Sequence, residues 1–174
     1  MRLLGIDPGL RLTGYGCIDA SGLSATLVEA GVFRLAKAGT TARSISSRLV
    51  ELDADFRGVL ERLRPEVVAI EGLFAHYKHP ATAIAMGHAR GVLLLAVEQA
   101  GLPLVELKPK AVKKSLTGFG AADKAQMQRA IQAEFNLPEP PNPPDVADAL
   151  AIALCALRRQ CGGTALQSGA LTPF

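Results

Sequence analysis

Two short apolar segments, separated by a long amphipathic one, constrain the fold of this chain more than any other feature. Residues 3–6 and 67–70 have the length and composition of buried strands, and each is followed within two residues by a proline or glycine. Residues 41–64, between them, carry apolar side chains at helical spacing: Ile45, Leu49, Leu52, Phe56, Val59 and Leu63. A strand, a crossover helix and a second strand place the two strands parallel in one sheet. The pattern therefore predicts an α/β fold.

Each of these two predicted strands ends on a carboxylate, Asp7 in the first and Glu71 in the second. Parallel strands of one sheet end at the same edge, and ligand sites of α/β proteins favour that edge. We therefore expect Asp7 and Glu71 to lie close together in a functional site. The alternative for Asp7 alone is a structural role, because Asp-Pro-Gly is also an ordinary turn sequence.

The remaining segments complete one domain. Further strands are predicted at residues 13–19, 25–35 and 103–107, and further helices at residues 81–100, 123–135 and 143–159. The result is a mixed five-stranded sheet flanked by helices in a domain of residues 1–160. Its core must be mostly aliphatic, because the chain is 49% hydrophobic but contains no tryptophan. Residues 161–174 have no pattern, and we expect a disordered tail there.

The last predicted helix carries two more acids in its first turns. Asp145 and Asp148 are three residues apart and so lie on one helix face. Acids at this position can simply complement the helix dipole, which accounts for one of them better than for both. Four carboxylates at the ends of core elements would repel one another unless a cation neutralised them. Oxygen ligands without His or Cys favour magnesium or manganese, and a pair of such ions supports hydrolysis of phosphodiester bonds.

Two segments have the composition of nucleic-acid contacts. The loop after Glu71 combines aromatic and basic residues, as suits base stacking and phosphate binding: Phe74, Tyr77 and Lys78. The densest basic cluster follows the last predicted strand: Lys108, Lys110, Lys113 and Lys114, with Lys124 farther along. The alternatives are a lid over the core for the first segment and a solvated loop for the second. Asp123 and Gln126 are expected to cap the helix that follows.

Composition also restricts the environment of the protein. No apolar run approaches the roughly 20 residues of a membrane span, and the N-terminus lacks a signal-peptide layout. The three cysteines have neither metal-binding nor redox spacing. We expect reduced thiols in a cytoplasmic protein that does not contact a membrane.

Four motifs in this order resemble the RuvC family of bacterial Holliday junction resolvases. They are Gly5-Ile-Asp7-Pro-Gly9 with Thr13-Gly-Tyr-Gly16, Ile70-Glu71-x-x-Phe74, Gly87-x-Ala89-Arg90-Gly91 and Asp145-Val-Ala-Asp148-Ala-Leu-Ala-Ile152. The resemblance covers residues 1 to about 158. It implies a ribonuclease H-like fold and a homodimer that makes paired, magnesium-dependent nicks across a four-way DNA junction. The implied enzyme is a crossover junction endodeoxyribonuclease of recombination and repair, loaded by a branch-migration complex of RuvA and RuvB.

The resemblance also assigns roles to residues. It makes Asp7, Glu71, Asp145 and Asp148 the metal ligands, with two Mg²⁺ ions per subunit and Mn²⁺ as a substitute. Lys113 and Lys124 match basic residues near the scissile phosphate, and Phe74 takes the place of a base-stacking aromatic. Some family members carry His at the position of Asp148, so direct metal binding by an acid is expected here.

Two other functions remain open from the sequence. Asp-x-Gly on a first strand also begins actin-like ATPases and sugar kinases, but these need a second phosphate-binding loop and a second lobe. A non-catalytic junction-binding protein would explain Phe74 and the lysines but not four acids. For a dimer, the candidate surface is the apolar helix of residues 81–100, where Gly87 and Gly91 form a flat strip.

Overall fold

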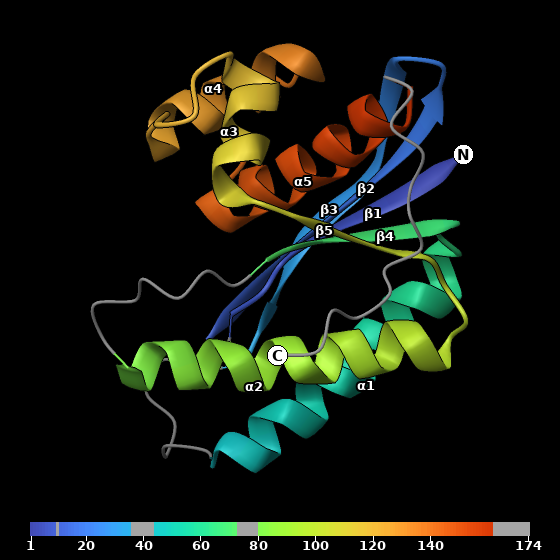
Figure 1. Ribbon diagram of the computed structural model, residues 1–174, viewed down its shortest axis with the longest axis vertical. Coiled ribbons are helices and arrows are strands. Elements are labelled where there is room, and N and C mark those ends of the chain that lie inside the picture. Colours follow the sequence, from blue (N-terminus) through green and yellow to red (C-terminus); the bar gives the residue numbers. More distant parts are fainter. Residues whose placement is uncertain (10, 36–43, 73–79, 162–174) are drawn as a thin grey trace.

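The computed structural model of the chain describes residues 1–9, 11–35, 44–72 and 80–161. A sheet lies between two groups of helices (Figure 1). The strands are β1 (Arg2–Asp7), β2 (Leu12–Ser21), β3 (Ser24–Arg34), β4 (Val67–Glu71) and β5 (Leu104–Leu107). The helices are α1 (Ile45–Leu63), α2 (Pro80–Gln99), α3 (Pro109–Thr117), α4 (Lys124–Glu134) and α5 (Pro144–Cys161).

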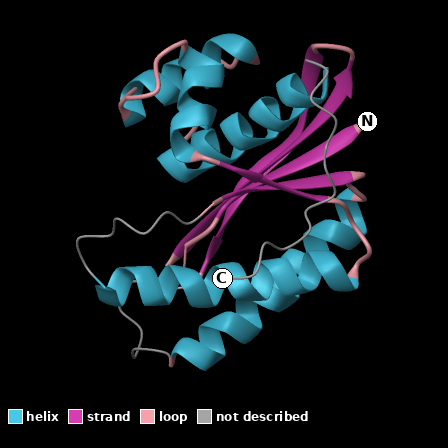
Figure 2. Ribbon diagram, in the orientation of Figure 1, coloured by secondary structure: helices cyan, strands magenta, loops and turns pink. Residues whose placement is uncertain are grey.

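The sheet is mixed, as the sequence predicts. Its strand order is β3-β2-β1-β4-β5. β1, β2 and β3 form an antiparallel meander, whereas β4 pairs in parallel with β1 and with β5. Helix α1 connects β1 and its antiparallel partners to β4, which confirms the predicted crossover. Helices cover both faces of the sheet (Figure 2).

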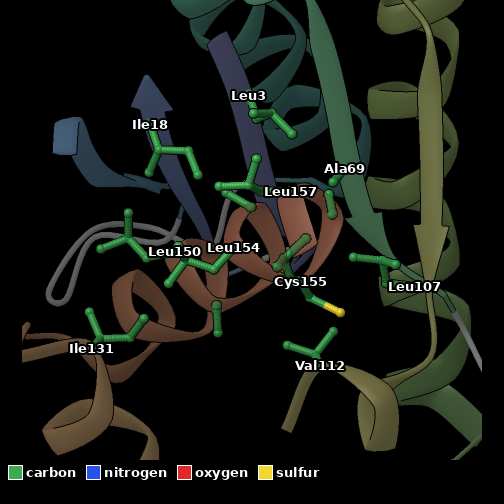
Figure 3. Close-up of a cluster of buried hydrophobic side chains, with 14 of the residues drawn as sticks. Leu3, Ile18, Ala69, Leu107, Val112, Ile131, Leu150, Leu154, Cys155 and Leu157 are labelled. Carbon is green, nitrogen blue, oxygen red and sulfur yellow. The ribbon is translucent and has the colours of Figure 1, made fainter. Parts of the chain in front are cut away.

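Each face of the sheet has its own aliphatic core. On one face α3, α4 and α5 pack against the strands, and Figure 3 shows Leu150, Leu154 and Leu157 of α5 beside Leu3 of β1 and Ile18 of β2. On the other face α1 and α2 cover a second cluster, to which Phe33 and Phe56 add aromatic rings. Neighbouring residues of β1 alternate between the two cores, as successive side chains of a strand must.

The basic segment after β5 is a helix, where the sequence led us to expect a loop. Pro109 stands in the first turn of α3, a position that suits its fixed φ and missing N–H. Val112 is buried and Leu116, four residues later, packs against the same core cluster. The helix therefore presents a narrow apolar edge to α5, while Lys110 and Lys114 are exposed. A stripe of only two apolar residues among lysines was too short to indicate a helix.

The predicted helix starts were close to the observed ones. Ser44 caps α1 through a 3.1 Å hydrogen bond from the Ser47 N–H, so this helix begins a turn later than expected. Asp123 and Gln126 form the predicted capping box at α4, with both hydrogen bonds 2.8 Å long. None of the helices within the described ranges is long and apolar enough to cross a membrane.

Glycines allow α5 to lie directly on the sheet. A methyl group on Gly5 would stand 2.1 Å from the Ala149 carbonyl oxygen, and one on Gly14 would stand 2.2 Å from the Asp145 carbonyl oxygen. Any other residue at either position would push helix and sheet apart. The first turn of α5 is thus held against β2, next to the end of β1.

Candidate active site

Two acids reach the site from the ends of neighbouring strands. Asp7 is the last residue of β1 and Glu71 the last of β4, and the residues before them, Ile6 and Ile70, are partners in the parallel ladder. Ile6 and Ile70 belong to the core under α1 and α2, so the following residue on each strand faces α5. The expectation that both acids lie at one edge of the sheet is therefore met, and on the same face.

Two further acids come from the first turns of α5. Asp145 lies against β2 at Gly14, which pairs with Asp7 across the antiparallel ladder. Asp148 follows almost one turn later on the same side of the helix. Three elements distant in sequence, β1, β4 and α5, thus bring together the four acids predicted as a site.

Burial and neighbouring negative charges make three of these carboxylates, Asp7, Glu71 and Asp148, hard to ionise. Burial, together with the charges of Asp148, Glu71 and Asp145, raises the pKa of Asp7 well above its usual range. Burial and the charge of Asp148 raise the pKa of Glu71 to about 7. Burial also raises the pKa of Asp148, and Asp145 adds to this effect. The negative charges of the acids act on one another, and a bound cation would lower this repulsion.

The fit of a metal can be judged from this donor set. All four side chains offer carboxylate oxygens, which are the ligands that hard divalent cations prefer. Within the described ranges, no three acid, histidine or cysteine side chains lie close enough together to form a ready ligand group. Binding of a shared cation therefore requires small movements of these side chains toward it. The repulsion that, together with burial, raises the pKa of Asp7 keeps the carboxylates apart when no cation is bound.

Two lysines border the acids. Lys124, the first residue of α4, opposes the rise in the pKa of Asp7 and of Asp148. Lys113 of α3 opposes the rise for Glu71, and its Nζ donates a 2.8 Å hydrogen bond to the Ala122 carbonyl oxygen. α3 and α4 thus place both lysines near enough to the acids for their charges to act on them.

Two supporting residues were missed by the sequence argument. The Thr13 hydroxyl is fully buried; it donates to the Gly9 carbonyl oxygen at 2.5 Å and accepts from the Gly9 N–H at 3.1 Å, which fixes the turn after Asp7. Arg90 of α2 donates a 3.4 Å hydrogen bond to the Glu71 carbonyl oxygen and forms an ion pair with Glu106. Both lie in the motifs quoted above, but only the fold shows what they contact.

The other predicted DNA contacts are placed only in part. Lys108, Lys110 and Lys114 are exposed on or beside α3. Phe74, Tyr77 and Lys78 lie outside the described residues, as do residues 162–174 of the predicted tail.

A pH prediction follows from the raised pKa of Glu71. In the unfolded chain this group loses its proton near its ordinary pKa of 4.5, but in the folded protein it keeps the proton to about pH 7. Between these values the folded state binds more protons, so the free energy of unfolding must fall as pH rises. We expect a fall of about 3 kcal/mol from this group in protein without divalent cations. Urea unfolding in chelator at a series of pH values should show a shallower fall for Glu71→Gln. Parallel profiles of the two proteins would contradict the assignment.

Comparisons with known proteins agree with this geometry. A family model described as "Crossover junction endodeoxyribonuclease RuvC" matches residues 3–156. A curated protein of that description from Rhodopirellula baltica is 45% identical over 153 residues, covering 88% of this chain and 84% of its own length.

Solved structures lead to the same family. RuvC of Thermus thermophilus in complex with a Holliday junction substrate superposes with a TM-score of 0.82 at 34% identity, covering 93% of this chain and 96% of that one. The yeast mitochondrial Holliday junction resolvase Ydc2 shares the fold, with a TM-score of 0.67 at 18% identity over 91% of this chain and 78% of that one. The expected ribonuclease H-like architecture is thereby confirmed. With a family model that spans nearly all of the described domain, the chain belongs to the RuvC family of crossover junction endodeoxyribonucleases.

Proposed function

We propose that this protein is an endodeoxyribonuclease that resolves four-way DNA junctions by paired symmetric nicks near the crossover, in homologous recombination and DNA repair. The observation that carries the proposal is the convergence of Asp7, Glu71, Asp145 and Asp148 at one edge of the sheet, within a chain of this family. A mere junction-binding protein would gain nothing from four clustered acids, three of which (Asp7, Glu71 and Asp148) have a raised pKa. The described residues form one sheet with its helices, and they include no second lobe of the kind that an actin-like ATPase or sugar kinase needs.

The chemistry proposed is hydrolysis of a DNA phosphodiester bond. The four acids would hold two Mg²⁺ ions, with Mn²⁺ as a substitute; bound ions of this kind supply an activated water and charge stabilisation at the leaving oxygen. Lys113 and Lys124 are placed to offset negative charge that develops on the phosphate in the transition state.

The decisive experiment uses a labelled synthetic four-way junction. With magnesium, the protein should convert it into two nicked duplexes by cuts placed symmetrically about the crossover. Chelator should stop cleavage while binding continues. Binding without any cleavage, in either magnesium or manganese, would favour the non-catalytic alternative. Isothermal titration of the metal gives an independent readout, because a protein that only binds DNA has no use for it.

The two lysines should affect the reaction rate more than binding. We expect Lys124→Ala and Lys113→Ala each to lower the single-turnover cleavage rate by about 10²-fold, with a smaller loss of affinity. Lys124 is exposed, so its removal should not disturb folding. Lys114→Ala, an equal change of charge on the exposed side of α3, is the matched control and should weaken affinity only. Equal losses of affinity and rate would mark Lys113 and Lys124 as simple phosphate anchors.

Further contacts with DNA are proposed for the loop after β4 and for the basic residues on and beside α3. Phe74 would stack on an unpaired base at the crossover, flanked by Tyr77 and Lys78, while Lys108, Lys110 and Lys114 would bind the phosphates of the arms. We also propose that the enzyme acts in the cytoplasm, together with a branch-migration complex of the RuvA and RuvB type. Three free cysteines in the described ranges fit a reducing compartment.

We further propose that the active unit is a homodimer formed through α2. A four-way junction has approximate two-fold symmetry, and two identical subunits present two sites in that relation. On this helix Ile84 is 60% exposed and Leu95 is 55% exposed. Between them Gly87 and Gly91 leave open space, since a methyl group on either would have no neighbour within 4 Å. The strip is flat and mostly apolar, with the exposed His88 on the same face, and its glycines favour close approach of a second backbone.

The dimer proposal predicts a mass near twice 18.2 kDa by light scattering at micromolar concentration. Gly91→Glu should give monomers that bind junctions poorly and nick at most one strand. Gly58→Glu on α1 is the matched control, because Gly58 is also an exposed helical glycine with open space around it. A wild-type monomer that makes coordinated paired nicks would exclude the proposal.

A further inference from the structure

One cavity in the described part of the chain lies beside the four acids and not among them. It has a volume of about 320 Å³ and is lined by Thr117, Phe119, Ala122, Gln126, Arg129 and Ala130. These residues come from the end of α3, the loop that follows it and one face of α4; we call them the Phe119 pocket. Nothing in the catalytic proposal uses this pocket.

The Phe119 pocket adjoins the catalytic lysines. Its lining residue Ala122 is the one whose carbonyl oxygen accepts the 2.8 Å hydrogen bond from Lys113. Lys124, whose charge acts on Asp7 and Asp148, begins the helix that forms the other wall. A DNA strand whose phosphate lies at Lys113 and Lys124 therefore has this pocket beside its next nucleotides.

An exposed aromatic ring stands at the rim. The Phe119 side chain is 62% exposed, although burying it in the core would be favourable. Its backbone is held in place: the Thr117 hydroxyl donates to the Phe119 carbonyl oxygen at 2.9 Å and accepts from its N–H at 3.2 Å. A methyl on Gly120 would lie only 3.3 Å from the Lys110 carbonyl oxygen, so the loop is packed closely against α3. The ring is thus presented outward by a braced turn.

The polar side chains of the pocket keep donors available for a ligand. Arg129 is exposed and has no hydrogen-bond or ion-pair partner among the described residues. Gln126 uses its side-chain oxygen for the helix cap at 2.8 Å, which leaves its amide N–H groups unpaired by any described residue. One cation, amide donors and one apolar ring match a chain of alternating phosphates and deoxyriboses. Arginine and glutamine can also donate to base edges, but the pocket adjoins the lysines proposed to hold the cleaved phosphate, and this position favours the backbone.

We propose that the Phe119 pocket binds the sugar–phosphate backbone of the junction arm next to the cleaved phosphate, with Phe119 against a deoxyribose and Arg129 on a phosphate. This inference rests on the proposed junction-resolving function and adds a second anchor to it. With the two lysines as one anchor and the Phe119 pocket as the second, the direction of the DNA strand through the site is fixed. It is independent of sequence, because its groups contact only the repeating part of DNA.

The test compares variants of the pocket with matched variants at the opposite end of the strands, away from the acids. Phe119→Ala should weaken junction binding about tenfold, because the apolar contact of the ring with the sugar is lost, and should leave the salt dependence of affinity unchanged, because the ring carries no charge. Arg129→Gln should weaken binding and lower the slope of log affinity against log salt by about one. The controls are Leu23→Ala, a 68% exposed apolar residue in the turn between β2 and β3, and Arg159→Gln, an exposed arginine at the other end of α5. Neither control should change affinity.

Two further readouts separate this site from the catalytic proposal. Hydroxyl-radical footprinting should show lost protection of sugars beside the cleavage position for Phe119→Ala, and the loss should be equal on junctions of different crossover sequence. Wild-type affinity, salt slope and footprint in both variants would overturn the inference, even if the wild-type protein resolves junctions normally. A loss confined to one crossover sequence would also overturn it, since it would indicate base reading. Failure of the wild-type protein to cut would instead concern the proposed function and leave the footprint comparison valid.

Discussion

Replacement of Asp7 with asparagine is expected to abolish junction cleavage while leaving junction binding intact. Asparagine has nearly the same shape but cannot carry the negative charge that a shared cation requires. Asp7 is also the most central of the four acids, because the other three all raise its pKa. We expect the single-turnover rate in magnesium to fall by about 10³-fold or more. Affinity for the junction should hold or rise slightly, since one negative charge beside phosphate is removed.

The control for this prediction is an equal change of charge elsewhere on the sheet. Asp19 lies on β2 at the opposite end of the strands, beside the start of β1, where it accepts hydrogen bonds of 2.9 and 2.7 Å from Arg2. Asp19→Asn should weaken this ion pair but cut junctions at close to the wild-type rate. If Asp7→Asn also cut at that rate, the assignment of the metal site to this edge of the sheet would be wrong.

The second large effect is expected at Gly14, which is not itself a functional group. An added methyl group would stand 2.2 Å from the Asp145 carbonyl oxygen, so Gly14→Ala must push the start of α5 off the sheet. We expect a loss of about 1–3 kcal/mol in the free energy of unfolding. Because Asp145 and Asp148 move with the helix, cleavage should fall by about 10²-fold even in protein that remains folded.

Gly58→Ala on α1 provides the comparison, because a methyl group there meets nothing within 4 Å. Alanine in an exposed helix position should stabilise the protein by about 0.5–1 kcal/mol and leave cleavage unchanged. Urea unfolding and single-turnover cleavage on both variants distinguish a displaced site from a general loss of stability. Normal cleavage by Gly14→Ala would mean that the position of α5 does not control the acids.

Much of the fold could be predicted because its strands are buried and its long helices are strongly patterned. β1 and β4 are continuous apolar segments, and each leads directly to an acid, so the proximity of Asp7 and Glu71 could be predicted from the ends of the strands. Helix α3 was missed because lysines mask its two apolar residues, Val112 and Leu116. The contacts of Thr13 and Arg90 were also missed, since a hydrogen bond to a distant backbone leaves no periodic signal.

Phe119 illustrates a different limit. It lies between two glycines, and nothing in the sequence indicates that its ring is exposed. Only the packing of the loop against α3 and α4 decides this. Phe74, by contrast, was singled out by its aromatic and basic neighbours and by family resemblance, and its role stays a prediction.

The glycine contacts between α5 and the sheet have a consequence for engineering this protein. Where main chain touches main chain, the spacing is set by atomic radii and not by the choice of side chains around it. Leu157 lies farther along the same helix, about one turn past the last of these contacts, at Ala153. Its neighbourhood can therefore be redesigned for heat tolerance while the reactive end of the helix keeps its position, so durability and catalysis can be optimised separately.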